Sequence, residues 1–287
     1  MGAVGETALE GVVLVVGASS GIGRATARLL AARGARLALA ARGADALAEV
    51  DQECRELGAR GTRVLPLDVT DLSAVENAID DTVAEFGRID AVVHCVAVLA
   101  YGRFHDIPAT VFNRVIETNL IGTANVARAA LRQFRAQGNG RLILLSSALG
   151  KTAIPYSSPY VTSKWAVHGL AAVLRMETRE TPGIRVTVVS PGSVDTPIYA
   201  RAATYFGRQG KPIPPVDPAD RVAAQIIRAI ESPRRERSIG RANHVLVTAY
   251  RLLPGVVDRL AGPVVRRFGF HRNHRAEPTE GNVFEPK

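Results

Sequence analysis

Short runs of aliphatic residues alternate with longer helix-forming segments over the first 190 residues of this chain. Strands that are buried on both faces of a parallel sheet have such an uninterrupted apolar composition. Helix-length segments lie between the runs, at 22–33, 44–57, 71–86, 108–136 and 160–180. The alternation predicts an α/β fold, a doubly wound parallel sheet of about seven strands with helices on both faces. The apolar runs are Val12–Val16, Leu37–Ala41, Val64–Leu67, Ala91–Ala97, Leu142–Leu145 and Val186–Val189.

The last third of the chain has a different pattern. Residues 197–218 contain five prolines and are predicted to form a mobile loop. A helix over Ala219–Glu231 and a short strand at Arg237–Ile239 are expected to complete the sheet. We therefore expect residues 1–240 to form a single domain, and residues 241–287 to form an extension that is not an independent domain.

A glycine-rich turn, Gly17-Ala18-Ser19-Ser20-Gly21-Ile22-Gly23, follows the first apolar run directly and leads into a helical segment. Glycine at these three positions allows a tight turn, a close backbone approach to a phosphate and close packing of the helix on the sheet. The helix N-terminus adds free N–H groups and a partial positive charge. A glycine triplet in this context predicts binding of the pyrophosphate of a dinucleotide.

The second apolar run ends in Leu39-Ala40-Ala41-Arg42, without a carboxylate. In a dinucleotide-binding fold this position meets the adenosine ribose, where an acidic residue binds the 2′-hydroxyl of NAD and a basic residue suits the 2′-phosphate of NADP. The guanidinium of Arg42 can pair with a phosphate through two N–H groups, and Ser19 can add a hydroxyl contact. We therefore expect NADP(H) rather than NAD(H); the alternative for Arg42 is a surface residue at a strand end.

Tyr160 and Lys164 are four residues apart, a spacing that places them on one face of a helix. A free tyrosine has a pKa of about 10, and a nearby cation lowers that pKa by favouring the phenolate. We expect Lys164, helped by the positive charge of an oxidised nicotinamide, to lower the pKa of Tyr160. Tyr160 can then exchange a proton with a carbonyl or alcohol oxygen. Ser147 follows the fifth run, at the sheet edge where ligands of this architecture bind.

These motifs together resemble the short-chain dehydrogenase/reductase family, over residues 10–240 and in the family's order. The resemblance implies a Rossmann fold and an NADP(H)-dependent oxidoreductase that interconverts a carbonyl and an alcohol, with Tyr160 as general acid/base. It implies that Ser147 orients the substrate oxygen and that Asn119 holds a water linked to Lys164. The alternative for Asn119 is a helix-kinking residue satisfied by backbone.

The resemblance also assigns contacts. The substrate is expected to be apolar and to meet Ser147, Tyr156 and Tyr160. No metal is expected, since Cys54 and Cys95 fit no ligand spacing. The coenzyme contacts are expected from Gly17, Ser19, Ser20, Gly21, Ile22, Gly23, Arg42, Asp68, Val69, Ala97, Tyr160, Lys164, Pro191, Gly192, Val194 and Thr196.

Two departures from the family's pattern affect the coenzyme site. Val16 precedes the first glycine, where many members have threonine, and His94-Cys95-Val96-Ala97 replaces Asn-Asn-Ala-Gly. Ala97 reduces backbone clearance beside the adenosine. We expect His94 to be a satisfied histidine of the core or sheet edge rather than an acid/base or a metal ligand. The altered motif favours the alternative function, a catalytically idle dinucleotide-binding protein that acts as a sensor or scaffold.

The basic character of the chain lies near its C-terminus, since residues 201–287 carry 16 Lys/Arg and 8 Asp/Glu, against 20 and 19 in the first 200. Similar basic extensions occur in bacterial members of the family. Segment 243–270 is predicted either to contact an anionic membrane peripherally or, because Pro254 and Pro263 interrupt a long helix, to form a cap or subunit contact. Residues 271–287 are expected to be poorly ordered.

The sequence also bears on the cellular location, the partners and the oligomeric state of the protein. The cysteine content and the lack of a signal peptide or a membrane-spanning apolar stretch predict a cytoplasmic protein. Nucleic-acid binding is not expected, since no recognised module accompanies the basic segment. The family resemblance implies a homodimer or homotetramer.

Overall fold

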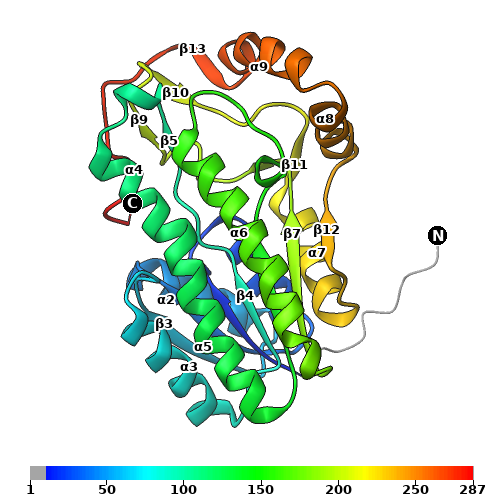
Figure 1. Cartoon of the computed structure of the whole chain (residues 1–287). Coiled ribbons are helices and arrows are strands. Elements are labelled where there is room, and N and C mark those ends of the chain that lie inside the picture. Colours follow the sequence, from blue (N-terminus) through cyan, green and yellow to red (C-terminus); the bar gives the residue numbers. More distant parts are fainter. Residues whose placement is uncertain (1–10, 287) are drawn as a thin grey trace, which may run out of the picture.

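A computed structural model describes residues 11–286 and centres on one sheet of seven parallel strands (Figure 1). Their spatial order is β12, β7, β6, β4, β1, β2, β3, so the direction of winding reverses between β1 and β4. The predicted doubly wound parallel sheet is confirmed. The strands are β1 Val12–Val16, β2 Arg36–Ala41, β3 Gly61–Pro66, β4 Ala91–His94, β6 Gly140–Leu145, β7 Ile184–Ser190 and β12 Glu236–Ser238.

Helices cover both faces of this sheet (Figure 1). Consecutive residues of β1 point into different layers: Val13 packs in one core with Leu30 and Ile226, and Leu14 packs in the other with Val126. Burial on both faces explains why these strands lack alternating polar residues. The first layer contains α1 Gly21–Ala31, α2 Ala44–Glu56 and α7 Ala219–Glu231, and the second contains α3 Leu72–Phe86, α5 Gly122–Gln137 and α6 Ser158–Glu177.

The structure divides the single helix that was predicted over 108–136. Helix α4 covers Ala109–Ile116, a π-helical turn covers Glu117–Ile121, and α5 continues from there. A π turn contains an extra residue relative to an α-helix and often lies at a functional site. This one carries Thr118 and Asn119, which are both buried.

The region after β7 is more regular than predicted. The loop expected at 197–218 forms short strands, and β13 Phe270–Arg275 pairs antiparallel with β10. Thr279 forms a bridge with Thr204. The expectation of poor order after residue 270 is therefore wrong for residues 271–286, whose backbone has partners there. The short elements are β5 Ala100–Tyr101, β8 Ser193–Asp195, β9 Ala203–Thr204, β10 Arg208–Gly210, β11 Val216–Pro218 and the 3-10 turns Phe104–Asp106, Ala148–Gly150 and Thr178–Glu180.

Two helices, α8 Arg241–Leu252 and α9 Pro254–Phe268, precede β13. Pro254 begins α9, where its missing N–H has no intrahelical partner to lose. The predicted interruption occurs at Pro254, which separates α8 from α9, but Pro263 lies inside α9, so the expectation that it also interrupts a helix is wrong. Val265 packs α9 against an apolar cluster that includes Tyr101. No helix within residues 11–286 is both long enough and apolar enough to cross a membrane.

Candidate active site

The glycine-rich turn forms part of a cleft at the carboxyl end of the sheet. Gly17 has a φ of +91°, a value that residues other than glycine rarely adopt. Its N–H donates to the Ala40 carbonyl oxygen at 2.7 Å. A Cβ at residue 23 would lie 2.0 Å from the Gly17 carbonyl oxygen, so α1 can pack on the turn only with glycine there. The Ser20 side chain does not cap α1, which leaves the N-terminal N–H groups for an anion.

Every residue predicted to contact the coenzyme lines this one cleft. The lining comes from the ends of β1, β2, β3, β4, β6 and β7, together with α6 and the chain after β7. A glycine-rich floor, at a helix N-terminus and a topological switch point, fits a dinucleotide. Sequence reasoning missed several lining residues, among them Thr118, Arg201, Asn282 and Pro286.

Ser147, Tyr160 and Lys164 meet in this cleft, where β6 ends and α6 begins. The Tyr160 hydroxyl shares a hydrogen bond with the Ser147 side chain. Ser147 Oγ also accepts the N–H of Leu149 at 3.1 Å, which fixes the orientation of Ser147. Lys164 lies one turn after Tyr160, with its Nζ 5.5 Å from the centroid of the tyrosine ring. The predicted trio is thus brought together.

The pKa of Tyr160 differs from the expectation. Burial raises it above its ordinary value and the neighbouring Tyr199 raises it further, while the hydrogen bond with Ser147 lowers it. The predicted lowering by Lys164 is not found in the protein alone, because burial removes the hydration of a phenolate and the Lys164 ammonium donates instead to the Leu145 carbonyl oxygen at 3.1 Å. Tyr160 is protonated at neutral pH, as a free tyrosine is, and its raised pKa makes the hydroxyl a weaker acid in the protein alone.

Burial also changes the pKa of Lys164. Its side chain is almost completely buried, and that burial lowers the pKa of the ammonium to about 8. Near neutral pH the group is charged, and the charge is lost as the pH rises through that value. Lys164 can therefore supply a positive charge to the cleft only below about pH 8.

Asn119 lies behind the cleft rather than on its surface. Its Oδ1 accepts the N–H of Val98 at 2.8 Å, and its Nδ2 donates to the Val98 carbonyl oxygen at 2.9 Å and to Ser163 Oγ at 3.1 Å. The side chain thus ties the segment after β4 to the π turn and to α6. The Asn119 carbonyl oxygen accepts the Thr123 hydroxyl at 2.7 Å and keeps a second lone pair.

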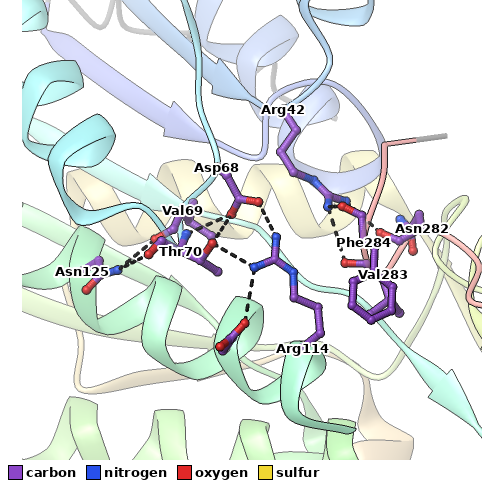
Figure 2. A network of polar contacts seen from close by, with 10 residues as sticks. Arg42, Asp68, Val69, Thr70, Arg114, Asn125, Asn282, Val283 and Phe284 are labelled. Carbon is purple, nitrogen blue, oxygen red and sulfur yellow. Dashed lines mark hydrogen bonds and ion pairs between the residues drawn. The ribbon is translucent and has the colours of Figure 1, made fainter. Parts of the chain in front are cut away.

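Arg42 lies where the adenosine ribose was predicted, and Figure 2 shows its guanidinium directed at the C-terminal segment. Its Nη1 donates to the Phe284 carbonyl oxygen and its Nη2 to the Asn282 carbonyl oxygen, each at 2.8 Å. The prediction placed Arg42 in the cleft but missed this partner, which is 240 residues away along the chain.

Asp68, one of the predicted coenzyme contacts, is also held by protein groups (Figure 2). It accepts the N–H and the hydroxyl of Thr70 at 2.9 Å, and it pairs with Arg114 of α4 at 2.5 Å. Burial raises the pKa of Asp68, but the hydrogen bonds from Thr70 and the charge of Arg114 lower it below its ordinary value on balance. The carboxylate therefore stays ionised and fixed at the edge of the cleft.

His94 is buried in β4, as expected for a core histidine, but it is not satisfied. Neither ring nitrogen has a hydrogen-bond partner within residues 11–286. Burial, with a smaller contribution from Lys164, lowers the pKa of His94 to about 3, so the ring is neutral. The expectation of a satisfied side chain is therefore wrong: neutrality avoids burying a charge, but the unpaired N–H donor and nitrogen acceptor of the ring still cost folding free energy.

Tyr156 belongs to an apolar cluster that also contains Tyr160, Tyr199 and Phe206. It has a φ of +69°, and its hydroxyl accepts a hydrogen bond from Arg266 of α9 at 2.7 Å. Tyr156 does not line the coenzyme cleft itself. The cluster gives the region beside Tyr160 an apolar character. Among the described residues, no group of three or more His, Cys, Asp or Glu is placed to hold a metal ion.

Comparison with known proteins identifies related sequences. The family described as short chain dehydrogenase matches residues 11–204. An uncharacterized oxidoreductase of Bacillus subtilis, YxnA, is 32% identical over 271 residues, which cover 93% of this chain and 75% of that protein. The cis-4-hydroxycyclohexanecarboxylate dehydrogenase of Sinomonas cyclohexanicum is 39% identical over 200 residues, or 69% of this chain and 78% of the relative.

Solved structures with the same fold include two oxidoreductases. An alcohol dehydrogenase from the archaeon Thermococcus sibiricus, complexed with 5-hydroxy-NADP, matches with a TM-score of 0.68 and 30% identity over 80% of this chain and 95% of its own. A short-chain dehydrogenase from Streptomyces avermitilis matches with a TM-score of 0.75 and 26% identity, over 87% of this chain and 96% of its own.

Proposed function

The chain belongs to the short-chain dehydrogenase/reductase family of oxidoreductases, and we propose that it interconverts a carbonyl compound and an alcohol with NADP(H). The observation that carries this proposal is the convergence of Ser147, Tyr160 and Lys164 on the cleft that begins at the glycine-rich turn. A dinucleotide sensor without catalysis would have no need of a buried lysine and a serine-bonded tyrosine in that place. The altered fourth strand, including His94, leaves these groups intact.

The coenzyme would be held along the whole cleft. The turn from Gly17 to Gly23 and the start of α1 would take the pyrophosphate, Arg42 the 2′-phosphate, and Asp68 and Val69 the adenine side. The segment Pro191–Thr196 would lie against the nicotinamide. When bound, the nicotinamide supplies or accepts the hydride. The Arg42 position supports NADP(H), and the archaeal relative's structure contains an NADP analogue.

The side chains of this protein move and hold the proton. In the reducing direction the Tyr160 hydroxyl gives its proton to the substrate oxygen. Ser147 donates a hydrogen bond that orients the same oxygen. Lys164 contributes a positive charge that stabilises the phenolate left behind. Oxidation of an alcohol needs the phenolate at the start, so it requires more help from neighbouring charge.

The substrate of this site is proposed to be apolar, because the residues around Tyr160 are aromatic and aliphatic. The cluster beside Tyr160 consists of Leu99, Tyr101, Ala202, Val265 and Phe270, with Ile154, Tyr156, Ile198, Tyr199, Phe206 and Ile213 packed on it. Apolar walls with a few polar groups at one end are the usual composition of a small-molecule pocket.

A screen of the purified protein tests the proposal. Aldehydes, ketones and alcohols with apolar substituents are offered with NADPH, NADP⁺, NADH and NAD⁺, and the absorbance of the reduced coenzyme is followed. We expect turnover of at least one carbonyl–alcohol pair, fastest with the phosphorylated coenzyme. Tight coenzyme binding without turnover of any compound would instead favour the sensor.

Helices α8 and α9 are proposed to have two roles. The inner side of α9 caps the substrate region through Val265 and the Arg266–Tyr156 hydrogen bond. The outer side of the two helices exposes Leu252, Leu253, Val256, Leu260, Val264 and Phe268 beside exposed arginines. Asp258 is the one acidic residue in segment 241–270. An apolar face with arginines at its edge suits peripheral contact with an anionic membrane.

The protein is further proposed to be a cytoplasmic homodimer or homotetramer acting on small molecules rather than nucleic acid. Trp165, Val173 and Met176 of α6 are exposed apolar residues that suit a contact between copies. The cysteines Cys54 and Cys95 are free thiols, in agreement with a reducing compartment. Light scattering coupled to size-exclusion chromatography measures the assembly directly.

A further inference from the structure

The C-terminal segment 279–286 forms one wall of the coenzyme cleft. Asn282 and Pro286 line the cleft together with Arg42. Figure 1 places the last described residues, in red, near α4 and α2, away from the helices α8 and α9 that precede them. The chain thus returns from the substrate side to the adenosine side of the cleft.

This segment is anchored by its backbone. Thr204 and Thr279 exchange two backbone hydrogen bonds, at 2.9 and 3.1 Å, and the Asn282 N–H donates to the Arg201 carbonyl oxygen at 2.9 Å. Gly281 makes the turn between them with a φ of +57°, and a Cβ there would lie 2.3 Å from the Arg201 carbonyl oxygen. The course of the segment therefore depends on glycine at this position.

One buried side chain holds the end of the segment in place. Val283 is fully buried in a cluster with Val98, Val111 and Ala203, and Phe284 packs on the same cluster. Unseating the segment would expose this apolar surface to water. The segment is consequently a built part of the fold rather than a loosely docked tail.

The carbonyl groups on both sides of Val283 converge on Arg42 (Figure 2). Besides the bonds to Asn282 and Phe284, Nη1 of Arg42 reaches the Val283 carbonyl oxygen at 3.5 Å. These carbonyls satisfy a guanidinium that is partly buried, and they fix its orientation. Nε of Arg42 has no partner within residues 11–286 and remains available to a ligand in the cleft.

A second polar atom of the segment is unsatisfied. Asn282 Oδ1 is buried and has no hydrogen-bond partner among the described residues, while Asn282 itself lines the cleft beside Arg42. A buried acceptor without a donor is costly, and a hydroxyl or amino group of a bound ligand would satisfy it. The ribose and the adenine of a dinucleotide both carry such donors.

We propose that segment 279–286 is the specificity wall of the coenzyme site, which positions Arg42 for the 2′-phosphate of NADP(H). The proposal rests on the proposed coenzyme binding and adds that preference for the phosphorylated form depends on the C-terminus. Arg42 alone, at the end of β2, is a long side chain with many rotamers. Held by the carbonyls of Asn282 and Phe284, it presents its remaining N–H groups in one orientation.

The opposite role would be competition, in which the segment withholds Arg42 from the phosphate. In that role a 2′-phosphate would have to draw the guanidinium away from the Asn282 and Phe284 carbonyl oxygens. The Nε of Arg42 can meet a ligand without breaking either bond, which favours the positioning role. The two roles predict opposite signs when the segment is removed, so one experiment separates them.

The test measures binding of two fragments by calorimetry, adenosine 2′,5′-bisphosphate and 5′-AMP, which differ in the 2′-phosphate. The ratio of their affinities is compared between the full chain and a chain that ends at Pro278. We expect truncation to lower the ratio by about tenfold, the effect of one charge-assisted hydrogen bond. Val283→Asp in the full-length chain should do the same by unseating the segment. Glu277→Gln, an exposed change just before it, is the matched control.

The same truncation in an Arg42→Ala background shows whether the wall acts through Arg42. We expect the ratio to be low already and to stay unchanged on truncation. The proposal would be overturned if truncation lowered the affinity ratio equally in the parent and Arg42→Ala backgrounds. It would also be overturned if the ratio stayed unchanged in both the truncated and the Val283→Asp chains, or if it rose. Failure of the full-length chain to bind either fragment would overturn the coenzyme site itself. Binding of both without turnover of any substrate would leave the wall intact and refute only the enzymatic activity.

Discussion

Replacing Gly23 by alanine is the most severe test of the predicted pyrophosphate-binding turn, Gly17–Gly23, because the added Cβ would clash with backbone atoms of Gly17. The added Cβ would lie 2.0 Å from the Gly17 carbonyl oxygen and 2.7 Å from the Gly17 carbonyl carbon. Ordinary contact begins at 3.4 Å, so α1 and the turn must separate by about 1.4 Å. No rotamer relieves this overlap, because neither atom belongs to a flexible side chain.

This displacement sets the expected loss of folding stability and the expected rise in the Kd for NADPH. Overpacking of this kind costs about 1–3 kcal/mol of folding stability. A shift of more than 1 Å also breaks at least one hydrogen bond between an N–H group and the pyrophosphate, which is worth about 1.5–3 kcal/mol and raises the Kd by roughly tenfold to a hundredfold. Calorimetric titration with NADPH and denaturant unfolding measure the two effects.

Gly169→Ala is the matched control. Gly169 lies in α6, and a Cβ there meets nothing within 4 Å. Because alanine favours a helix over glycine by about 1 kcal/mol, this variant should be slightly more stable and bind NADPH as the parent does. If Gly23→Ala kept both the stability and the Kd of the parent, the packing of the turn on α1 would not explain coenzyme binding.

Three further outcomes are expected. Because the lowered pKa of Lys164 is about 8, its ammonium is lost as the pH rises through that value, so kcat for carbonyl reduction should fall there; a pH profile without that fall would refute the role of the charge. Arg42→Asp should reverse the preference between NADPH and NADH in a titration of both, since a carboxylate repels the 2′-phosphate and accepts from a ribose hydroxyl; unchanged relative affinities would refute the assignment. The double variant Leu253→Asp, Val256→Asp should no longer sediment with phosphatidylglycerol vesicles. If the parent protein sedimented with phosphatidylglycerol vesicles no more than with phosphatidylcholine vesicles, the proposed membrane contact would be refuted.

The sheet could be predicted from the sequence because its signal is local. A strand buried on both faces must be apolar throughout, so Val12–Val16 was recognised with its exact bounds. The coenzyme cleft could be predicted for a related reason, since the carboxyl ends of parallel strands must meet at one edge. Once the strands are known, Arg42, Ser147 and Pro191 are brought together by topology.

Contacts between distant segments could not be read from the sequence. Residues 271–286 are polar, with few apolar side chains to predict a packed structure, and their position depends on single residues such as Val283 and Gly281. The pairing of Asp68 with Arg114 leaves no sequence pattern, because each charge alone is typical of a surface. The raised pKa of Tyr160 in the protein alone was not predicted, because a sequence shows the nearby cation but not the extent of burial.

The central claim is that Tyr160 transfers the proton. Tyr160→Phe removes one oxygen atom and leaves the ring in its cluster, so the measurement is kcat for the best carbonyl substrate alongside the Kd of NADPH. We expect kcat to fall by at least a hundredfold, within the range for loss of general acid catalysis, while the Kd stays within about twofold. A variant that reduces the same carbonyl at the parent's rate would contradict the account.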